Sequence, residues 1–287
     1  MLEKFFKLSE NHTDAKTEIL AGITTFMTMA YILAVNPSIM AATGMDSGAV
    51  FTATALAAFI GTLLMAIFAN YPFALAPGMG LNAYFAYTVV IGMGYTWQYA
   101  LTAVFAEGII FILLSLTNVR EAIFNAIPMN LKSAVSVGIG LFIAFVGLQN
   151  AHIVVGGSTL LQLFSVDAYN KANGVEASFN NVGITVILAL AGIIITGILV
   201  VKNIKGNILW GILITWGLGI ICQFAGLYVP NADLGFYSLL PDFSKGLSIP
   251  SLTPIFGKLQ FKGIFSVDFI VILFAFLFVD LFDTIGT

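Results

Sequence analysis

Charged residues are scarce in this sequence. They make up 9% of its 287 residues, where an ordinary soluble domain carries about 25%, and 59% of the chain is hydrophobic. A soluble domain has too little interior to hide so much apolar surface from water. Lipid is therefore the solvent that most of this surface meets, and the composition predicts a protein that crosses a membrane several times.

Basic residues, cysteine and histidine are also few. The chain has 11 Lys and Arg residues and a net charge of −3, which gives no reason to expect a nucleic-acid partner. Its single cysteine, Cys222, excludes an internal disulfide. His12 and His152 lie far apart in the sequence with no cysteine nearby, so we expect neither a metal site nor a cofactor.

Long apolar runs define the organisation of the chain. A run of about 20 apolar residues is long enough to cross the hydrocarbon core as a helix. We expect an all-α polytopic fold with seven membrane segments and a truncated eighth, over residues 266–287. The seven predicted segments are residues 18–38, 49–69, 71–93, 97–117, 133–150, 181–201 and 207–228. We expect the first of them to end near Asn36 and Pro37.

The remaining stretches are too polar or too rich in proline to span. We expect residues 118–132 to form an interfacial segment, because their apolar residues can gather on one side of a helix. Residues 230–265 hold four of the eight prolines and are expected to form a long loop. Basic residues favour the cytoplasmic side of a membrane. If segment 1–17 is cytoplasmic, seven basic residues lie on the cytoplasmic side and four on the outer side. We therefore expect a cytoplasmic N-terminus and an extracellular long loop.

The third predicted segment is interrupted. Its sequence YPFALAPGMGLNAYFAY, residues 71–87, contains two prolines and two glycines within nine residues. Pro77 lacks the N–H that a helix needs, and it biases Ala76 toward an extended conformation. We therefore expect a short extended strand over residues 73–76, followed by a half-helix that begins near residues 78–81.

The start of such a half-helix offers unpaired backbone N–H groups and the positive end of the helix dipole. Asn82 lies in its first turn and can both donate and accept hydrogen bonds, and Gly80 permits a ligand to approach the backbone. Irregular backbone at membrane depth is tolerated where it is buried in protein or lines a polar cavity. The interruption therefore indicates half of a binding site. The alternative is a kinked helix whose small residues only allow tight packing.

Two aspartates lie in the final apolar run. Asp280 and Asp283 are three residues apart in FLFVDLFDTIGT, residues 276–287, and so share a helix face. An ionisable residue costs roughly 2.5–3.5 kcal/mol at the centre of a span, so such residues face the protein interior or a pathway. The pair can exchange protons, bind a cation or accept N–H bonds from a ligand. The alternative is that one of them, Asp280 more readily, caps a helix break.

Further polar residues lie within the predicted spans. Glu107 is either a third ionisable group on a pathway or a residue hydrogen-bonded to a neighbouring helix. A polar stripe in the first span either faces the site or bonds back to its own helix. The stripe consists of Thr24, Thr25, Thr28 and Tyr31.

Three sequence blocks carry a likeness to a known family. They are AGITTFMTMAYILAVNP (21–37), ALAPGMGLNAYF (74–85) and VDLFDTIGT (279–287). In this order they resemble the AzgA-like purine permeases, the hypoxanthine/guanine/adenine branch of the nucleobase–cation symporter superfamily that also contains the uracil and xanthine carriers. The resemblance implies two inverted seven-helix repeats, divided between a core and a gate domain. This chain then corresponds to the first half, with 18–117 and 266–287 in the core domain and 133–229 in the gate domain.

The resemblance also implies roles for single residues. By position, Asp283 matches the eighth-helix carboxylate that faces the substrate, and Asp280 matches the acid that supports it. Asn82 matches an important asparagine of the third helix, while Phe73 and Ala74 fall where its strand presents backbone to the base. A nucleobase is then expected between the third and tenth helices, against the eighth.

The implied function is import of hypoxanthine, guanine or adenine by proton symport with alternating access in the cell membrane. Thr287 stands where the related uracil carriers have a histidine, so a carboxylate is the better candidate for proton coupling. Phe73 or Tyr84 can stack on the face of a purine ring. Related carriers dimerise through the gate domain, which makes a homodimer an expected assembly.

Two other classes of protein fit the sequence less well. An anion carrier or channel of the same fold needs a fixed positive charge in its site, and no Lys or Arg lies within a predicted span. An intramembrane aspartyl protease needs its two acids opposed on different helices, whereas Asp280 and Asp283 share one helix face. We therefore expect a transporter rather than an enzyme.

Overall fold

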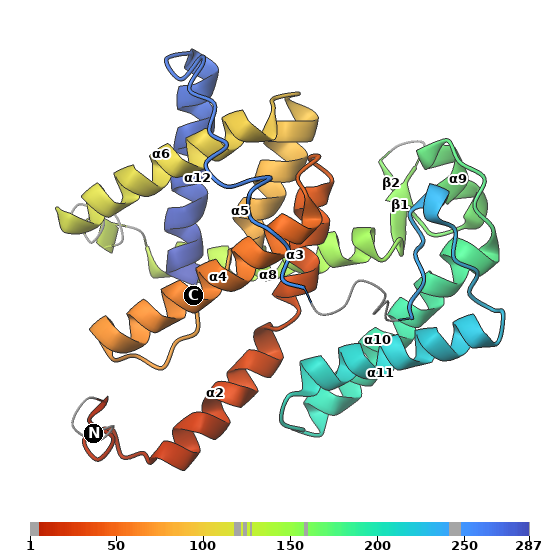
Figure 1. Cartoon of the computed structure of the whole chain (residues 1–287), viewed down its shortest axis with the longest axis horizontal. Coiled ribbons are helices and arrows are strands. Elements are labelled where there is room, and N and C mark those ends of the chain that lie inside the picture. The colour runs from red at the N-terminus through yellow and green to blue at the C-terminus, as the bar shows by residue number, and fades with distance from the viewer. Residues whose placement is uncertain are drawn as a thin grey trace. The chain divides into compact units, whose positions relative to one another are not determined.

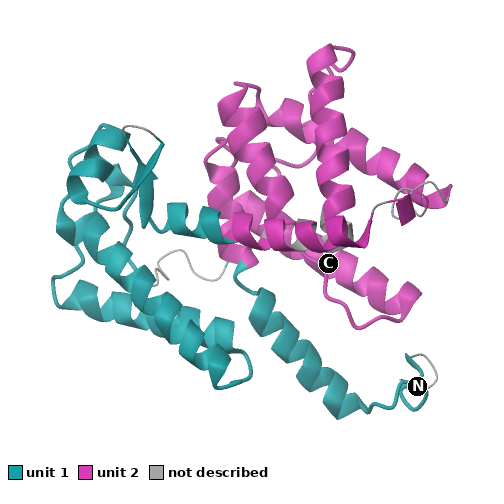
Figure 2. Ribbon diagram, turned by 180° about the vertical axis from the view of Figure 1, so that it is seen from behind, with its two compact units in different colours: residues 1–31, 144–248 teal, residues 32–143, 249–287 magenta. Residues whose placement is uncertain are grey.

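The structure is a computed structural model that describes residues 6–117, 122, 125–126, 128–157, 160–240 and 248–286, without the side chains of residues 135, 136, 139 and 283–286. Helices dominate the fold (Figure 1). The chain divides into two compact units (Figure 2). Unit 1 consists of residues 1–31 and 144–248, and unit 2 consists of residues 32–143 and 249–287. Each unit is thus assembled from segments that are far apart in the sequence.

Five helices among the described residues are long and apolar enough to cross a membrane. They are Ala15–Ala41, Ser47–Ala69, Trp97–Leu116, Phe179–Val201 and Asn207–Phe224. Two shorter apolar helices, Met79–Gly92 and Gly140–Asn150, lie within the third and fifth predicted segments. A polytopic helical membrane protein is thereby confirmed, while the count of seven segments and the inverted repeat remain predictions.

Unit 2 contains most of the elements that concern function. They are α3 (Ile32–Ala41), α4 (Ser47–Leu64), η1 (Met65–Ala69), α5 (Met79–Ala83), η2 (Tyr84–Gly92), α6 (Trp97–Leu116) and α12 (Val267–Gly286). The two elements η1 and η2 are π-helical continuations of α4 and α5. The helix α8 (Met129–Asn150) begins in unit 2 and ends in unit 1.

Unit 1 contains the remaining helices and a small sheet. Its other elements are α2 (Ala15–Met29), β1 (Val154–Gly156), β2 (Leu161–Leu163), α9 (Val166–Asn173), η3 (Phe179–Gly183), α10 (Ile184–Val201), α11 (Asn207–Phe224) and η4 (Ala232–Leu234). The all-α prediction was wrong about the antiparallel pair of β1 and β2. The β-branched Val154 and Val155 favour a strand here, outside the predicted spans.

The first span differs from its predicted form. The sequence predicts one helix over residues 18–38 that ends near Pro37, whereas the structure contains α2, a turn at residues 30–31, and α3 with Pro37 inside it. A proline removes one helical hydrogen bond, and its ring crowds the carbonyl four residues earlier. The distortion of the helix therefore falls before the proline, and the chain continues as a helix beyond it.

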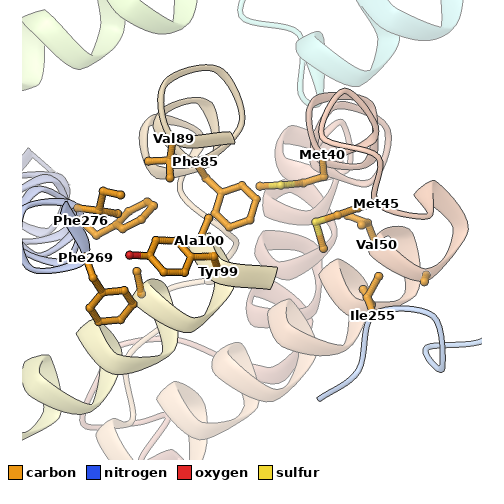
Figure 3. Close-up of a cluster of buried hydrophobic side chains, with 13 residues drawn as sticks. Met40, Met45, Val50, Phe85, Val89, Tyr99, Ala100, Ile255, Phe269 and Phe276 are labelled. Carbon is orange, nitrogen blue, oxygen red and sulfur yellow. The ribbon is translucent and has the colours of Figure 1, made fainter. Parts of the chain in front are cut away.

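Helices α6 and α12 share the core of unit 2 (Figure 3). Phe269, Ile272 and Phe276 recur at helical spacing on α12 and are buried. They cluster with Ala100 and Ala103 of α6, whose small side chains let the two helices approach closely. This packing fixes the positions of the polar residues further along both helices.

Ile255, from the stretch before α12, belongs to the same buried cluster. The backbone carbonyl of Pro250 in this stretch accepts a hydrogen bond from Thr52 Oγ1 on α4, at 2.8 Å. Part of the predicted long loop 230–265 is therefore folded onto the helices of unit 2.

A candidate substrate site at the interrupted third span

The helix of the third span is interrupted at residues 70–78, which form neither helix nor strand. Asn70 ends η1 in the left-handed conformation, with φ of 52°. α5 then begins at Met79, within the window that the sequence predicts, and no side chain among the described residues caps its first turn. The backbone N–H groups at the start of α5 are therefore available to a ligand. The strand expected over residues 73–76 is not formed among the described residues.

Thr62 of α4 fixes the interrupted segment. The backbone N–H of Leu75 donates to Thr62 Oγ1 at 2.9 Å, and this hydroxyl lies 3.4 Å from the carbonyl oxygen of Leu75. Gly61 lies against the Leu75 side chain, where a Cβ on residue 61 would make an ordinary van der Waals contact with Leu75 Cβ at 3.5 Å. Ala74 beside it is partly exposed. Phe73 is 60% exposed, with its ring stacked 5.8 Å from the ring of Tyr71.

Asn82 is held by two residues that the sequence analysis did not select. Its Nδ2 donates to Oδ1 of Asn36 on α3 at 2.7 Å. Asn36 Nδ2 in turn donates to Oγ1 of Thr54 on α4, also at 2.7 Å. Asn36 is 6% exposed and Thr54 is 2% exposed. The sequence could have indicated these residues, because each is a polar side chain within an apolar span. It did not show that Asn36, Thr54 and Asn82 contact one another.

Glu107 and Asp280 form the second polar feature of unit 2. Glu107, on α6, is 3% exposed, and its Oε1 has no hydrogen-bond partner in the part of the chain that the structure describes. It interacts electrostatically with Asp280 on α12, which is half-buried one turn beyond Phe276. α6 and α12 pack against each other (Figure 1), which brings two carboxyl groups from different helices within range of each other's charge.

Two predicted site residues cannot be placed. The backbone of Asp283 belongs to α12, but its side chain is outside the described residues, as is all of Thr287. The predicted pairing of Asp280 with Asp283 therefore remains a prediction.

Most of the aromatic and hydroxyl side chains predicted for the site pack against other helices or bond to their own helix. The ring of Tyr84 lies edge-on to Phe276 with centroids 5.1 Å apart, which places it at the packing of η2 on α12. Gly80 lies in the first turn of α5 and is partly exposed. Thr25 and Thr28 donate to backbone carbonyls of their own helix, Ala21 O at 2.9 Å and Thr25 O at 2.7 Å.

Thr24 makes the same kind of bond, to Leu20 O at 2.8 Å, and Tyr31 follows the end of α2. The stripe of the first span lies in unit 1, whereas the interrupted segment lies in unit 2. The threonine bonds favour the alternative in which the hydroxyl groups of this stripe bond back to their own helix rather than face the site.

A group of side-chain bonds ties the beginning of α12 to the beginning of α6. Tyr95 donates from its hydroxyl to Asp268 Oδ2 at 2.6 Å. This bond raises the pKa of Tyr95 to about 12, with smaller contributions from burial and from the negative charge of Asp268. Nearby, Thr96 Oγ1 donates to Gln260 Oε1 at 2.8 Å, and the backbone N–H of Gln260 donates to Thr102 Oγ1 at 2.8 Å.

Long apolar helices, an interrupted span and the buried carboxyl group of Glu107 together indicate an integral membrane protein. Residues 16–287 match the xanthine/uracil permease family, described as the Permease family. The chain belongs to this family, and its likeness to the AzgA-like purine permeases is confirmed.

Relatives with assigned names are similar over almost the whole chain. The guanine/hypoxanthine permease PbuG of Bacillus subtilis is 43% identical over 100% of this chain and 61% of its own length. PbuO, a guanine/hypoxanthine permease of the same organism, is 43% identical over 98% of this chain and 60% of its own length. The adenine permease AdeP of Escherichia coli is 37% identical, over 100% and 58% respectively. The chain thus spans about three fifths of the length of these relatives.

The Tyr95–Asp268 bond predicts a pH dependence. Because the phenol must keep its proton to donate, the bond is fully present below pH 10 and is lost as the pH rises through about 12. In a spectrophotometric titration of the tyrosines, we expect the step near pH 12 to be missing in Tyr95→Phe. Asp268→Asn is the matched control, and it shifts that step back toward pH 10. An unchanged titration curve in both variants would contradict the bond.

Proposed function

We propose that this chain provides part of a carrier that imports purine nucleobases through the cell membrane by proton symport, with its N-terminus in the cytoplasm. The observation that supports this most is that relatives named as guanine/hypoxanthine and adenine permeases match it over 98–100% of its residues. The interrupted third span supplies a second, independent reason, because it brings unpaired backbone donors and the Asn82 amide to one place.

The chemistry of a purine suits the groups gathered there. A purine base is neutral and planar, and it carries ring N–H groups, ring nitrogens and, in hypoxanthine and guanine, a carbonyl oxygen. The N–H groups at the start of α5 can donate to a carbonyl or a ring nitrogen. Asn82 can serve either kind of group, and the exposed ring of Phe73 offers a stacking surface. We assign the carboxylate that accepts a ring N–H to Asp283, by the resemblance alone.

The proton-binding group in this proposal is the pair of Glu107 and Asp280. A proton on either carboxyl group removes one of the two negative charges, and Oε1 of Glu107 has no hydrogen-bond partner in the described part of the chain. The titratable residues of η2, which packs on α6 and α12, are Tyr84 and Tyr87. Asp268 lies at the other end of α12, where it accepts a hydrogen bond from Tyr95. Loading and release of the proton would change the charge beside Asp283 on the same helix, which links proton binding to substrate binding.

Alternating access needs two bodies that can move against each other. The chain folds into two compact units, each with its own buried cluster. We infer that unit 2, with the interrupted span and α12, carries the substrate, and that unit 1 belongs to the opposing body.

Uptake of radiolabelled hypoxanthine tests the proposed function. The complete product of the gene that encodes this chain is expressed in cells without purine carriers of their own. We expect the wild type to import the label and Asp283→Asn to lose uptake at equal membrane level, since an amide cannot replace the charge-assisted bond. Failure of the wild type with hypoxanthine, guanine and adenine alike would contradict the purine substrate. Normal uptake by Asp283→Asn would remove Asp283 from the site.

Coupling to protons is tested separately with Glu107→Gln. We expect this variant to exchange labelled for unlabelled hypoxanthine across the membrane but to lose accumulation against a gradient, because the shared proton has lost one of its two carboxyl groups. The measurement is uptake with and without a protonophore, and Glu176→Gln, which changes an exposed carboxylate, is the control. Accumulation by Glu107→Gln with unchanged sensitivity to the protonophore would show that the pair is not the coupling site.

A further inference from the structure

Three helices of unit 2 are joined by one chain of buried hydrogen bonds. Asn82 Nδ2 on α5 donates to Asn36 Oδ1 on α3 at 2.7 Å, and Asn36 Nδ2 donates to Thr54 Oγ1 on α4 at 2.7 Å. Thr54 Oγ1 donates to the backbone carbonyl of Val50, one turn earlier on α4, at 2.7 Å. With Asn36 6% and Thr54 2% exposed, water does not compete for the bond between Asn36 and Thr54.

This chain of bonds has a fixed direction. A backbone carbonyl can only accept, so the single hydroxyl proton of Thr54 is committed to Val50 and Thr54 Oγ1 must accept from its other partner. Asn36 must therefore turn its NH₂ toward Thr54, which leaves its Oδ1 facing Asn82. Asn82 is then obliged to present its NH₂ to Asn36. The orientation of the Asn82 amide follows from the bonding pattern, in which each side chain has only one way to satisfy both neighbours.

The opposite end of the Asn82 amide is left for another partner. Oδ1 of Asn82 makes no hydrogen bond within the part of the chain that the structure describes, and the residue is only half-buried. The backbone N–H of Asn82 is already bonded to Gly78 O at 3.2 Å, so the side chain is the part of this residue that remains available. It lies in the first turn of α5, beside the end of the interrupted segment.

We propose that Asn36 and Thr54 are positioning residues that hold Asn82 with its Oδ1 toward the substrate, where it accepts a hydrogen bond from an N–H of the purine. This inference rests on the proposed function. The site then selects for bases that carry a donor at the contacted position and against bases that present an acceptor there. Without the chain of bonds an asparagine can offer either end of its amide, and that selection is lost.

Thr54→Val and Thr54→Ser form the first test. Valine keeps the shape of threonine without the hydroxyl, and serine keeps the hydroxyl. Thr117→Val is the control, because Thr117 makes the same bond to the carbonyl four residues earlier but lies exposed at the end of α6. The measurement uses the complete gene product in cells, with apparent affinities for hypoxanthine, guanine and adenine obtained from competition with labelled hypoxanthine at equal membrane levels.

We expect Thr54→Val to weaken the apparent affinity for hypoxanthine by about tenfold and to shrink the ratio between the best and the poorest of the three bases, since one oriented hydrogen bond is lost. Maximal uptake per carrier should change less than the affinity. Thr54→Ser and Thr117→Val should match the wild type. Equal affinities and equal selectivity in Thr54→Val and Thr54→Ser would overturn the inference.

Asn36→Asp and Asn36→Leu give a second test that does not depend on Thr54. An aspartate at position 36 offers an acceptor to Asn82 whether or not it is protonated, whereas leucine offers none. We expect Asn36→Asp to keep the selectivity of the wild type and Asn36→Leu to lose it. The reverse order, or equal selectivity in both, would contradict the inference. A wild type that takes up no purine contradicts the proposed function instead, so the two failures are distinguishable.

Discussion

Water is absent from the hydrocarbon core of a membrane, so each backbone group that an interrupted helix releases needs a partner from the protein or from a ligand. Nine residues, 70–78, leave the helix between η1 and α5. Thr62 of α4 takes up the N–H of Leu75, and the packing of Leu75 over Gly61 holds the segment in place. Among the described residues no side chain caps the N–H groups at the start of α5, so these donors are available to a ligand.

The same constraint accounts for the two buried polar groupings of unit 2. The amides of Asn36 and Asn82 bond to each other, and their chain of bonds ends on a backbone carbonyl through Thr54, so it joins three helices and leaves Oδ1 of Asn82 open to another partner. Glu107 differs, because its buried Oε1 has no hydrogen-bond partner in the part of the chain that the structure describes. A side chain held in one orientation with one acceptor left over suits the binding of a substrate, while an incompletely paired carboxyl near the charge of Asp280 suits a group that gains and loses a proton.

Local sequence signals predicted much of this arrangement. Apolar runs located the long helices, and Pro77 with the following Gly78 and Gly80 located the break, because both effects act within a few residues. The prediction that the first helix ends near Pro37 was wrong, because a proline distorts the turn before it and need not end the helix. The partnership of Asn36, Thr54 and Asn82 was not predictable, because it depends on how α3, α4 and α5 pack.

The central claim, that the interrupted third span binds the purine, is tested most directly by chemical labelling of position 74, where a substitution leaves Asn82 in place. Cys222 is the single cysteine of the chain, so Ala74→Cys is combined with Cys222→Ser in the complete gene product, with any further cysteine of that product also replaced by serine. The rate at which a small maleimide modifies the thiol at position 74 is measured in membranes with and without hypoxanthine. The account predicts that hypoxanthine slows the labelling, and that adenosine, whose ribose is too bulky for a site built for the free base, does not. Labelling at the same rate with and without every purine base would contradict it.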